Sequence, residues 1–166
     1  DSKVEEYYLK AMKKGNLYAT YDSYAYSIAD TIIIDINLDV QKKTDDNNTL
    51  NHYDVDLSSF KKAIESIGKI CKENVLILVE TTVPPGTCNK IIKPILKSCL
   101  QRRGLSNNKF KIAHSYERVM PGPDYIDSIQ NFYRVYSGID EKSANAAESF
   151  LKTIIRTDKF PLTRLG

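Results

Sequence analysis

The feature that most restricts the fold is a short run of β-branched and leucine residues, Val75 to Val79, which ends abruptly in the segment ETTVPPGT, Glu80 to Thr87. Such a run is typical of a parallel strand covered on both faces, and the two prolines that follow prevent the strand from continuing. A helix is expected next. In open α/β sheets, ligands lie outside the carboxyl ends of the strands, so this turn is a candidate binding site by its position.

Backbone donors at the turn favour the same interpretation. Because proline carries no N–H, the donors free to meet an anion or a polar ligand at the helix start are those of Gly86, Thr87 and Cys88. The hydroxyls of Thr81 and Thr82 are expected to face the same crevice. The alternative is a capped strand-to-helix turn that holds no ligand, and this stretch alone does not decide between the two.

Strands and helices alternate along the rest of the chain. Apolar runs and alternating patterns predict further strands over Leu17 to Thr20, Thr31 to Ile36, Phe110 to Ala113, Tyr133 to Ser137 and Lys159 to Thr163. Helical spacing predicts helices over Val4 to Lys13, Leu57 to Lys72, the Pro-Pro-Gly turn to Leu100, Asp124 to Asn131 and Asp140 to Ile155. This alternation predicts a doubly wound, mostly parallel α/β sheet.

Single residues refine these boundaries. Asp22 is expected to cap a short helix that ends at Ile28, and Asp56 is expected to cap the long helix after it. Pro94 predicts a kink in the helix that follows the Pro-Pro-Gly turn, since its ring displaces one backbone hydrogen bond.

Two regions show no clear period. The polar stretch Gln41 to His52 is predicted to be a surface loop, and loops of this length are often functional or mobile. Six tyrosines lie near the start of the chain: Tyr7, Tyr8, Tyr18, Tyr21, Tyr24 and Tyr26. They suggest either a surface on which ligands stack or half-buried packing residues. We favour packing, because the tyrosines share no period and have no arginine partners nearby.

Composition excludes several classes. A chain of 166 residues fits one domain, and its net charge of +3 is spread without a basic block, so nucleic acid is not an expected partner. No apolar run approaches the roughly 20 residues of a membrane span, and no secretory signal pattern begins the chain. Cys71, Cys88 and Cys99 are expected to be reduced, structural thiols of a cytoplasmic protein.

Polar residues follow three of the predicted strands: Asn37, then Thr81 with Thr82, then Glu117 with Arg118. Right-handed crossovers bring the ends of these strands to one edge of the sheet. A carboxylate there can act as a base or orient water, and a neighbouring hydroxyl can hold that water. The alternative for Glu117 is an ion pair with Arg118 or Arg134, which the residues alone slightly favour.

Some familiar sites are not indicated. His114 has only His52 as a second histidine, so we expect no metal site and interpret His114 as a hydrogen-bonded residue at a strand end. The seven glycines never reach the spacing GxGxxG of a dinucleotide-binding fingerprint, and no serine or cysteine lies in a recognisable nucleophile motif.

Four segments nevertheless resemble the UDP-glucose/GDP-mannose dehydrogenases, which are NAD-dependent nucleotide-sugar dehydrogenases. In chain order they are GNLYATYD (Gly15 to Asp22), ADTIIIDIN (Ala29 to Asn37), ETTVPPGT (Glu80 to Thr87) and SYERVMPG (Ser115 to Gly122). Their order and spacing match across nearly the whole chain. The ERVMPG form looks most like the branch that oxidises N-acetylated UDP-hexosamines.

The resemblance implies a two-step oxidation of the C6 hydroxyl of a UDP-sugar to a carboxylate by two NAD⁺, through a cysteine-bound intermediate. It implies catalytic roles for Thr82, which positions water, and Glu117, which assists thioester hydrolysis. The residues implied to border NAD are Asp35, Ile36, Asn37, Thr81, Thr82 and Val83, within a loop that extends to Asp39. Those implied to border the sugar nucleotide are Glu117, Arg118, Val119, Met120 and Pro121.

The chain departs from the family pattern at two of these places. Asn37, Leu38 and Asp39 stand where the family usually ends its strand in Pro-Thr-Pro, which puts direct hydroxyl contacts to the cofactor in doubt there. Tyr116 replaces the common proline before the glutamate.

The resemblance also implies that residues 1–166 are the central and C-terminal part of a Rossmann-like NAD-binding domain. Relatives have a first βαβ segment with the glycine fingerprint before this region, then linker helices and a second domain with the nucleophilic cysteine after it. The chain alone is therefore expected to be inactive and monomeric, and the complete protein to be a cytoplasmic homodimer of polysaccharide biosynthesis. The alternative is a non-catalytic α/β module that binds a nucleotide or sugar nucleotide.

The same resemblance gives a strand order. In the family order 3-2-1-4-5-6, Leu17 to Thr20 is the third strand and Thr31 to Ile36 the fourth. The two strands between them belong to the implied preceding segment, so one edge of the fourth strand is expected to lack a partner within this sequence.

Overall fold

The run that begins at Val75 forms the centre of the sheet. The computed structural model describes residues 2–38 and 40–166, and in it strand β4 (Leu76–Val79) is buried at all four positions. It lies between β1 (Thr31–Ile34) and β5 (Lys111–His114) and is parallel to both. Ile32, Ile77 and Ile112 lie side by side in this register, so each strand contributes isoleucine to the same face.

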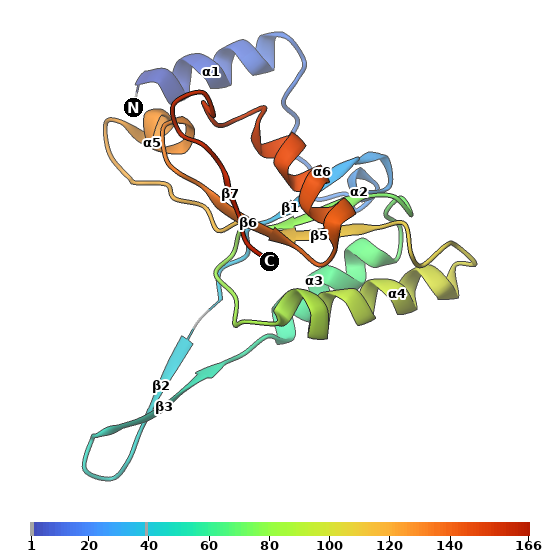
Figure 1. Ribbon diagram of the computed structural model, residues 1–166, viewed down its shortest axis with the longest axis vertical. Helices are drawn as coiled ribbons and strands as arrows, with labels where there is room; N and C mark the ends of the chain where they lie inside the picture. Colours follow the sequence, from blue (N-terminus) through green and yellow to red (C-terminus); the bar gives the residue numbers. More distant parts are fainter. Residues whose placement is uncertain (1, 39) are drawn as a thin grey trace.

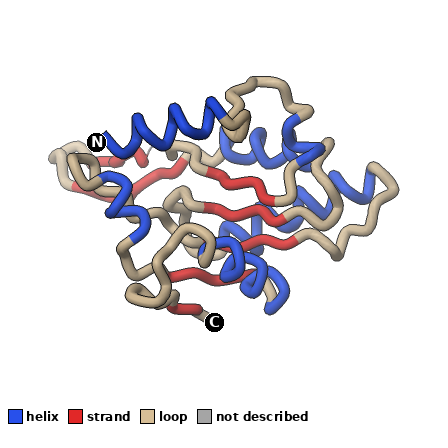
Figure 2. The backbone as a smooth tube through the Cα atoms, turned by 90° about the horizontal axis from the view of Figure 1, so that it is seen from above, coloured by secondary structure: helices blue, strands red, loops and turns tan. Residues whose placement is uncertain are grey.

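The complete sheet has the order β1-β4-β5-β6-β7. Strand β6 (Val135–Gly138) is antiparallel to β5, and the two-residue strand β7 (Thr163–Arg164) is parallel to β6. Figure 2 shows these strands side by side. The predicted α/β class with a mostly parallel sheet is confirmed, although the last two strands begin later than the sequence pattern predicted.

Helices cover both faces of the sheet, as the doubly wound prediction requires (Figure 1). On one face, α3 (Ser58–Gly68) and α4 (Lys93–Arg102) enclose a core that includes Phe60, Ile64, Ile77, Leu96 and Ile112. On the other face, α6 (Glu141–Leu151) packs over β4, β5 and β6, where Ala144, Ala147 and Leu151 meet Leu76, Leu78 and Tyr136. None of the helices in the described ranges combines the length and apolar character that crossing a membrane requires.

Aspartates organise the starts of the helices. The Ser58 N–H donates to Asp56 Oδ1 at 2.8 Å, and the Tyr24 N–H donates to Asp22 Oδ1 at 2.9 Å just before α2 (Ala25–Ile28). At α6, the Ser143 N–H donates to Asp140 Oδ1 at 2.8 Å. The capping predictions for Asp22 and Asp56 are wrong as made, because Tyr24 and Leu57 hold the cap positions; each aspartate lies just before the cap and accepts a nearby backbone N–H.

The interruption expected at Pro94 takes the form of a change in hydrogen bonding. A π-helical segment, η1 (Cys88–Ile92), precedes α4, and the Lys93 N–H donates to the Cys88 carbonyl. Pro94 is the second residue of α4, directly after this segment, so the bond that its nitrogen cannot donate falls at the junction of η1 and α4.

The predicted surface loop Gln41 to His52 is wrong, because this stretch forms an antiparallel hairpin of β2 (Val40–Thr44) and β3 (Leu50–Val55). The turn is closed by Asp45, whose Oδ1 accepts from the N–H groups of Asn47 and Thr49, while Asn48 adopts a φ of 62°. The hairpin projects from the body, and nearly all its side chains are exposed (Figure 1). A strand that buries neither face need not alternate apolar and polar residues, so the sequence carried no two-residue pattern that would predict these strands.

The N-terminal region also differs from the prediction. Helix α1 (Ser2–Lys13) forms as expected, but Leu17 to Thr20 is irregular and is not a strand. Tyr18 and Tyr21 are 87% and 105% exposed, and of the six tyrosines only Tyr26 is half-buried, so the packing prediction is wrong for the others. Within the described residues β1 is the edge strand of its sheet, and no neighbouring strand is present for Leu17 to Thr20 to pair with.

Candidate active site

A cavity of about 310 Å³ lies at the carboxyl ends of β1, β4 and β5. It is lined by Asp35, Ile36, Asn37, Leu38, Glu80, Thr81, Thr82 and Glu117. Three parallel strands deliver these residues to one edge of the sheet, which is where open α/β sheets place their ligands. The predicted convergence of Asn37, the threonine pair and Glu117 is thus confirmed. Asp39 lies outside the described residues.

The two threonines have different environments. The Thr81 side chain is 7% exposed; its Oγ1 accepts from the Ile36 N–H at 2.7 Å and lies 3.0 Å from the Ile36 carbonyl. This hydroxyl ties the end of β4 to the segment after β1, and Thr81 also lines the cavity. Thr82 is exposed and lines the cavity.

Glu117 is half-buried, and its carboxylate is held by its own loop. The Val119 N–H donates to Glu117 Oε2 at 2.5 Å. Neither predicted arginine forms an ion pair with it: the Arg118 guanidinium lies 5.4 Å from the centre of the Phe132 ring, and Arg134 lies beside Glu80. The ion-pair alternative is therefore not what the structure shows, and the carboxylate stays at the cavity.

Glu80 also lines this cavity, and the sequence reasoning did not include it among the site residues. Its Oε1 lies 3.6 Å from an Arg134 terminal nitrogen, and both side chains are largely buried. Burial raises the pKa of the Glu80 carboxyl, the Arg134 charge opposes this, and the nearby carboxylates of Asp35 and Glu117 add to the rise. Its place directly after a buried strand was the available signal, because the next residue, Thr81, had already been assigned to the site.

Three carboxylates around one cavity indicate what kind of group can bind there. Asp35, Glu80 and Glu117 offer acceptors that suit hydroxyl groups, such as those of a ribose, and they repel phosphate. The lining therefore suits a group rich in hydroxyls, and no cationic side chain lines this cavity to bind a phosphate.

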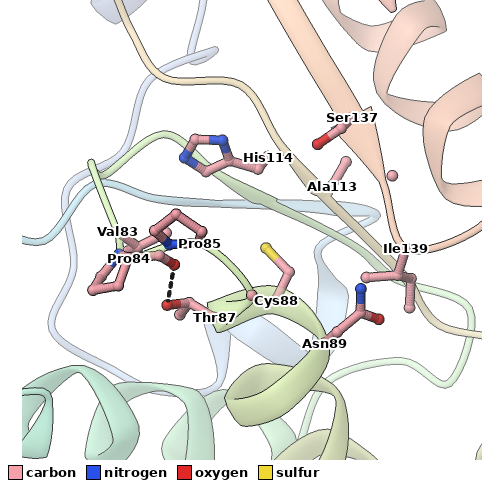
Figure 3. Close-up of a pocket in the computed structure, with 12 residues that line it drawn as sticks. Val83, Pro84, Pro85, Thr87, Cys88, Asn89, Ala113, His114, Ser137 and Ile139 are labelled. Carbon is pink, nitrogen blue, oxygen red and sulfur yellow. Dashed lines mark hydrogen bonds between the residues drawn. The ribbon is translucent and has the colours of Figure 1, made fainter. Parts of the chain in front are cut away.

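A second cavity, also of about 310 Å³, lies beside the Pro-Pro-Gly turn (Figure 3). It is lined by residues 83–89, Ala113, His114 and residues 137–139, so Val83 lies here and not with Thr82. The Thr87 N–H and hydroxyl both donate to the Pro84 carbonyl, at 3.2 and 2.7 Å, which corrects the expectation that this N–H is free for a ligand. Gly86 has a φ of 87°, a conformation that favours glycine.

Two reactive side chains at this second cavity are accounted for by their surroundings. Burial raises the pKa of the Cys88 thiol to about 11, so it is protonated and weakly nucleophilic at neutral pH. His114 Nε2 lies 3.2 Å from the Thr81 carbonyl, which confirms the interpretation of a hydrogen-bonded histidine at a strand end. Cys71, Cys88 and Cys99 form no disulfide, and Cys71 and Cys99 are buried as expected of structural thiols.

The loop after β5 forms a third cavity of about 240 Å³. It is lined by Tyr116, Glu117, Arg118, Val119, Met120 and Phe132. Pro121 and Met120 line a neighbouring hollow with residues of α5 (Tyr125–Gln130), where the Met120 N–H donates to the buried Ser128 hydroxyl at 3.0 Å. Glu117 is shared by the third cavity and the cavity at the strand ends, so it lies where the two meet.

Comparison with known proteins agrees with this arrangement. A sequence profile of the UDP-glucose/GDP-mannose dehydrogenase family, NAD binding domain, matches residues 1–155. The chain belongs to this family. Its cofactor is NAD, and the Rossmann-like character predicted from the sequence is confirmed.

Curated relatives are similar over about 60% of the chain. The UDP-N-acetyl-D-mannosamine dehydrogenase of Methanocaldococcus jannaschii is 39% identical over 108 residues, which are 65% of this chain and 23% of that protein. The UDP-N-acetyl-D-glucosamine 6-dehydrogenase of Pseudomonas aeruginosa is 33% identical over 104 residues, 63% of this chain and 24% of that protein. The chain thus spans about a quarter of the length of these relatives.

Solved structures extend the likeness to almost the whole chain. The UDP-D-ManNAc dehydrogenase of Pyrococcus horikoshii superposes with a TM-score of 0.73 at 26% identity, covering 95% of this chain and 34% of that one. The UDP-N-acetyl-mannosamine dehydrogenase of Staphylococcus aureus gives a TM-score of 0.75 at 20% identity, covering 97% and 34%, and at that identity it supports the fold alone.

Proposed function

We propose that the complete protein is an NAD-dependent nucleotide-sugar 6-dehydrogenase, which oxidises the C6 hydroxyl of a UDP-sugar to a carboxylate. The observation that carries the proposal is the position of Glu117, which lines both the cavity at the strand ends and the cavity of the following loop. A carboxylate between a cofactor site and a substrate site can act on the substrate. The names of the relatives favour an N-acetylated UDP-hexosamine.

The cofactor site is proposed to consist of the residues at the ends of β1 and β4: Asp35, Ile36, Asn37, Thr81, Thr82 and Val83. Bound NAD⁺ supplies the hydride acceptor for each of the two oxidation steps. The Asp35 carboxylate is suited to accept from ribose hydroxyls, and Thr81 keeps the two strand ends at a constant separation through its bonds to Ile36.

The sugar nucleotide is proposed to lie along the loop formed by Glu117, Arg118, Val119, Met120 and Pro121. Arg118 is exposed and held over Phe132, so its guanidinium is available to a diphosphate, which a planar fork of donors binds well. Ser128 fixes this loop by accepting from the Met120 N–H.

Two residues are proposed to act in hydrolysis. Thr82 holds the attacking water, and Glu117 takes a proton from it as the water oxygen bonds to C6. The bond between C6 and a cysteine sulfur then breaks, and its electron pair leaves with the sulfur as a thiolate. The net reaction converts one alcohol, two NAD⁺ and one water to a carboxylate, two NADH and three protons. None of Cys71, Cys88 and Cys99 is proposed as that nucleophile, because two are buried and Cys88 is protonated.

The remaining expectations follow from the family and are part of the same proposal. The complete protein is proposed to be a cytoplasmic homodimer in polysaccharide biosynthesis. Residues 1–166 by themselves are proposed to have no turnover, since they provide no nucleophilic thiolate.

The test is turnover by the complete protein with NAD⁺ and a series of UDP-hexoses and N-acetylated UDP-hexosamines, measured as NADH formed per sugar consumed. Two NADH per sugar are expected. Glu117→Gln should slow hydrolysis and leave a covalent sugar adduct that intact-mass spectrometry detects, whereas Glu65→Gln, an exposed glutamate on α3, should behave as wild type.

A contrary result is equally clear. Binding of NAD⁺ and a UDP-sugar without any turnover would favour a non-catalytic binding module instead. Normal turnover of Glu117→Gln without an adduct would remove Glu117 from the mechanism. Thr82→Ala should lower kcat more than it weakens substrate binding, and a pure binding defect would contradict its proposed role with water.

A further inference from the structure

Arg134 connects the two loops that carry the proposed catalytic residues. It directly precedes β6 and is only 3% exposed. One of its terminal nitrogens donates to the Tyr116 carbonyl at 3.1 Å and also lies 3.6 Å from Glu80 Oε1. Tyr116 directly precedes Glu117 in the sequence, and Glu80 lies two residues before Thr82. A single guanidinium thus contacts the segment after β4 and the segment after β5.

The loop that carries Glu117 is held by several hydrogen bonds, and Arg134 makes one of those nearest to Glu117. The Ser115 hydroxyl donates to the Val135 carbonyl at 3.0 Å, and the next residue, Tyr116, is held by Arg134. Beyond that point the Glu117 carboxylate accepts from the Val119 N–H of its own loop. The Ser115 N–H also donates to the Val79 carbonyl at 3.0 Å, so a backbone hydrogen bond and the Arg134 side chain together link this loop to the end of β4.

The ion pair is poorly suited to a purely stabilising role. Burying an arginine and a glutamate carries a large desolvation cost, which is offset only when the geometry is excellent and every donor is satisfied. Here the separation is 3.6 Å, and the buried Arg134 Nε has no hydrogen-bond partner in the part of the chain that the structure describes. Buried polar groups left in this condition call for an explanation other than stability.

We propose that Glu80 and Arg134 form a clamp that positions Glu117 relative to Thr82, with Arg134 as the positioning residue and Glu80 as its anchor. The inference rests on the proposed function, because it concerns the placement of the base in that reaction. Arg134 holds the Tyr116 carbonyl, and Glu80 keeps the guanidinium beside the end of β4. The clamp needs no contact with the substrate.

The experiment compares four variants of the complete protein: Arg134→Lys, Arg134→Met, Glu80→Gln, and the double variant Glu80→Gln with Arg134→Met. Arg156→Met, in an exposed arginine of the turn after α6, is the matched control. For each, kcat, the KM for the UDP-sugar, the melting temperature and the covalent adduct are measured. A displacement of the base by about 1 Å costs roughly 100-fold in rate, so Arg134→Met should lower kcat on that scale with little change in KM.

The adduct and the double variant separate positioning from folding. Arg134→Met should accumulate the same covalent adduct as Glu117→Gln, and Arg134→Lys, which keeps the charge and a donor, should retain more turnover. Removing both charges is often neutral for stability, so the double variant should recover the melting temperature of the wild type but keep the low kcat. The control should show neither defect.

Other outcomes overturn the inference. If kcat follows the melting temperature across the variants, and the double variant recovers both, the pair is structural. An active wild type whose Arg134 variants turn over normally also excludes the clamp while leaving the proposed function intact. A wild type that binds NAD⁺ but never turns over any UDP-sugar overturns the proposed function, and the clamp with it.

Discussion

Two faces of strand β1 show how differently the same residue type can be used. Ile32 and Ile34 are 7% and 2% exposed beneath α3 and α4, whereas Ile33 between them is 45% exposed on the opposite face. Helix α6 packs on that opposite face over β4, β5 and β6, further along the sheet (Figure 1). Three consecutive isoleucines therefore belong to a packed core and to an open surface, and the helices decide which.

The contrast extends beyond this strand. The α3/α4 side contains side chains with no exposed surface, such as Phe60, Ile64 and Ile77. The N-terminal region and the hairpin instead expose large apolar side chains, among them Tyr18, Tyr21, Val40 and Tyr53. Stability should consequently depend strongly on the first region and weakly on the second.

The largest expected effect is in the α3/α4 core. Phe60→Ala should lower the free energy of unfolding by about 3–5 kcal/mol, because it removes a fully buried aromatic ring and leaves a cavity. Urea denaturation of the complete protein measures the loss. Ile33→Ala, on the exposed face of β1, is the control and should cost far less; equal losses would show that the two faces are packed alike.

An intermediate effect is expected where α6 begins on the other face. Asp140→Ala should cost about 1 kcal/mol, since it removes the side chain that accepts from the Ser143 N–H. Burial, the largest single influence, raises the pKa of Asp140, but the hydrogen bonds from Ser143 and the charges of Lys93 and Lys142 outweigh it and the net pKa is lowered.

The sign of the pH dependence follows. A carboxyl whose pKa is lower in the folded than in the unfolded protein stabilises the fold fully above its unfolded pKa, and this contribution is lost as the pH falls through the folded pKa. The difference between wild type and Asp140→Ala should therefore be constant near neutral pH and shrink below about pH 4. Asp46→Ala in the exposed hairpin turn is the control. A difference that grows on acidification would contradict the cap.

The smallest effect is expected at the N-terminal region. Tyr21→Ser should change the free energy of unfolding by no more than about 0.5 kcal/mol, because the side chain is fully exposed and has little packing to lose. The same urea titration measures it. A loss above about 1 kcal/mol would mean that another part of the complete protein covers Tyr21, which would sharpen the comparison by assigning that surface to an interface.

Much of the candidate site could be predicted from local patterns. Apolar runs predicted the buried strands. The polar residues after these strands were expected to lie together, and Asn37, Thr82 and Glu117 do line one cavity. Thr81 was expected at the site, but its hydrogen bonds to Ile36 could not be foreseen, since they depend on how β1 and β4 are paired. The hairpin was missed because exposed strands carry no apolar alternation.

By itself, the sequence determined the elements that bury apolar surface and the strand ends at which polar residues gather, because both follow from short-range periodicity and from the chemistry of proline and aspartate. Only the tertiary structure decided which arginine pairs with which glutamate. Glu80 and Arg134 are more than fifty residues apart in the sequence. They meet because β5 lies between β4, which Glu80 follows, and β6, which Arg134 precedes. Long-range pairing of charges depends on strand order, and no local pattern records it.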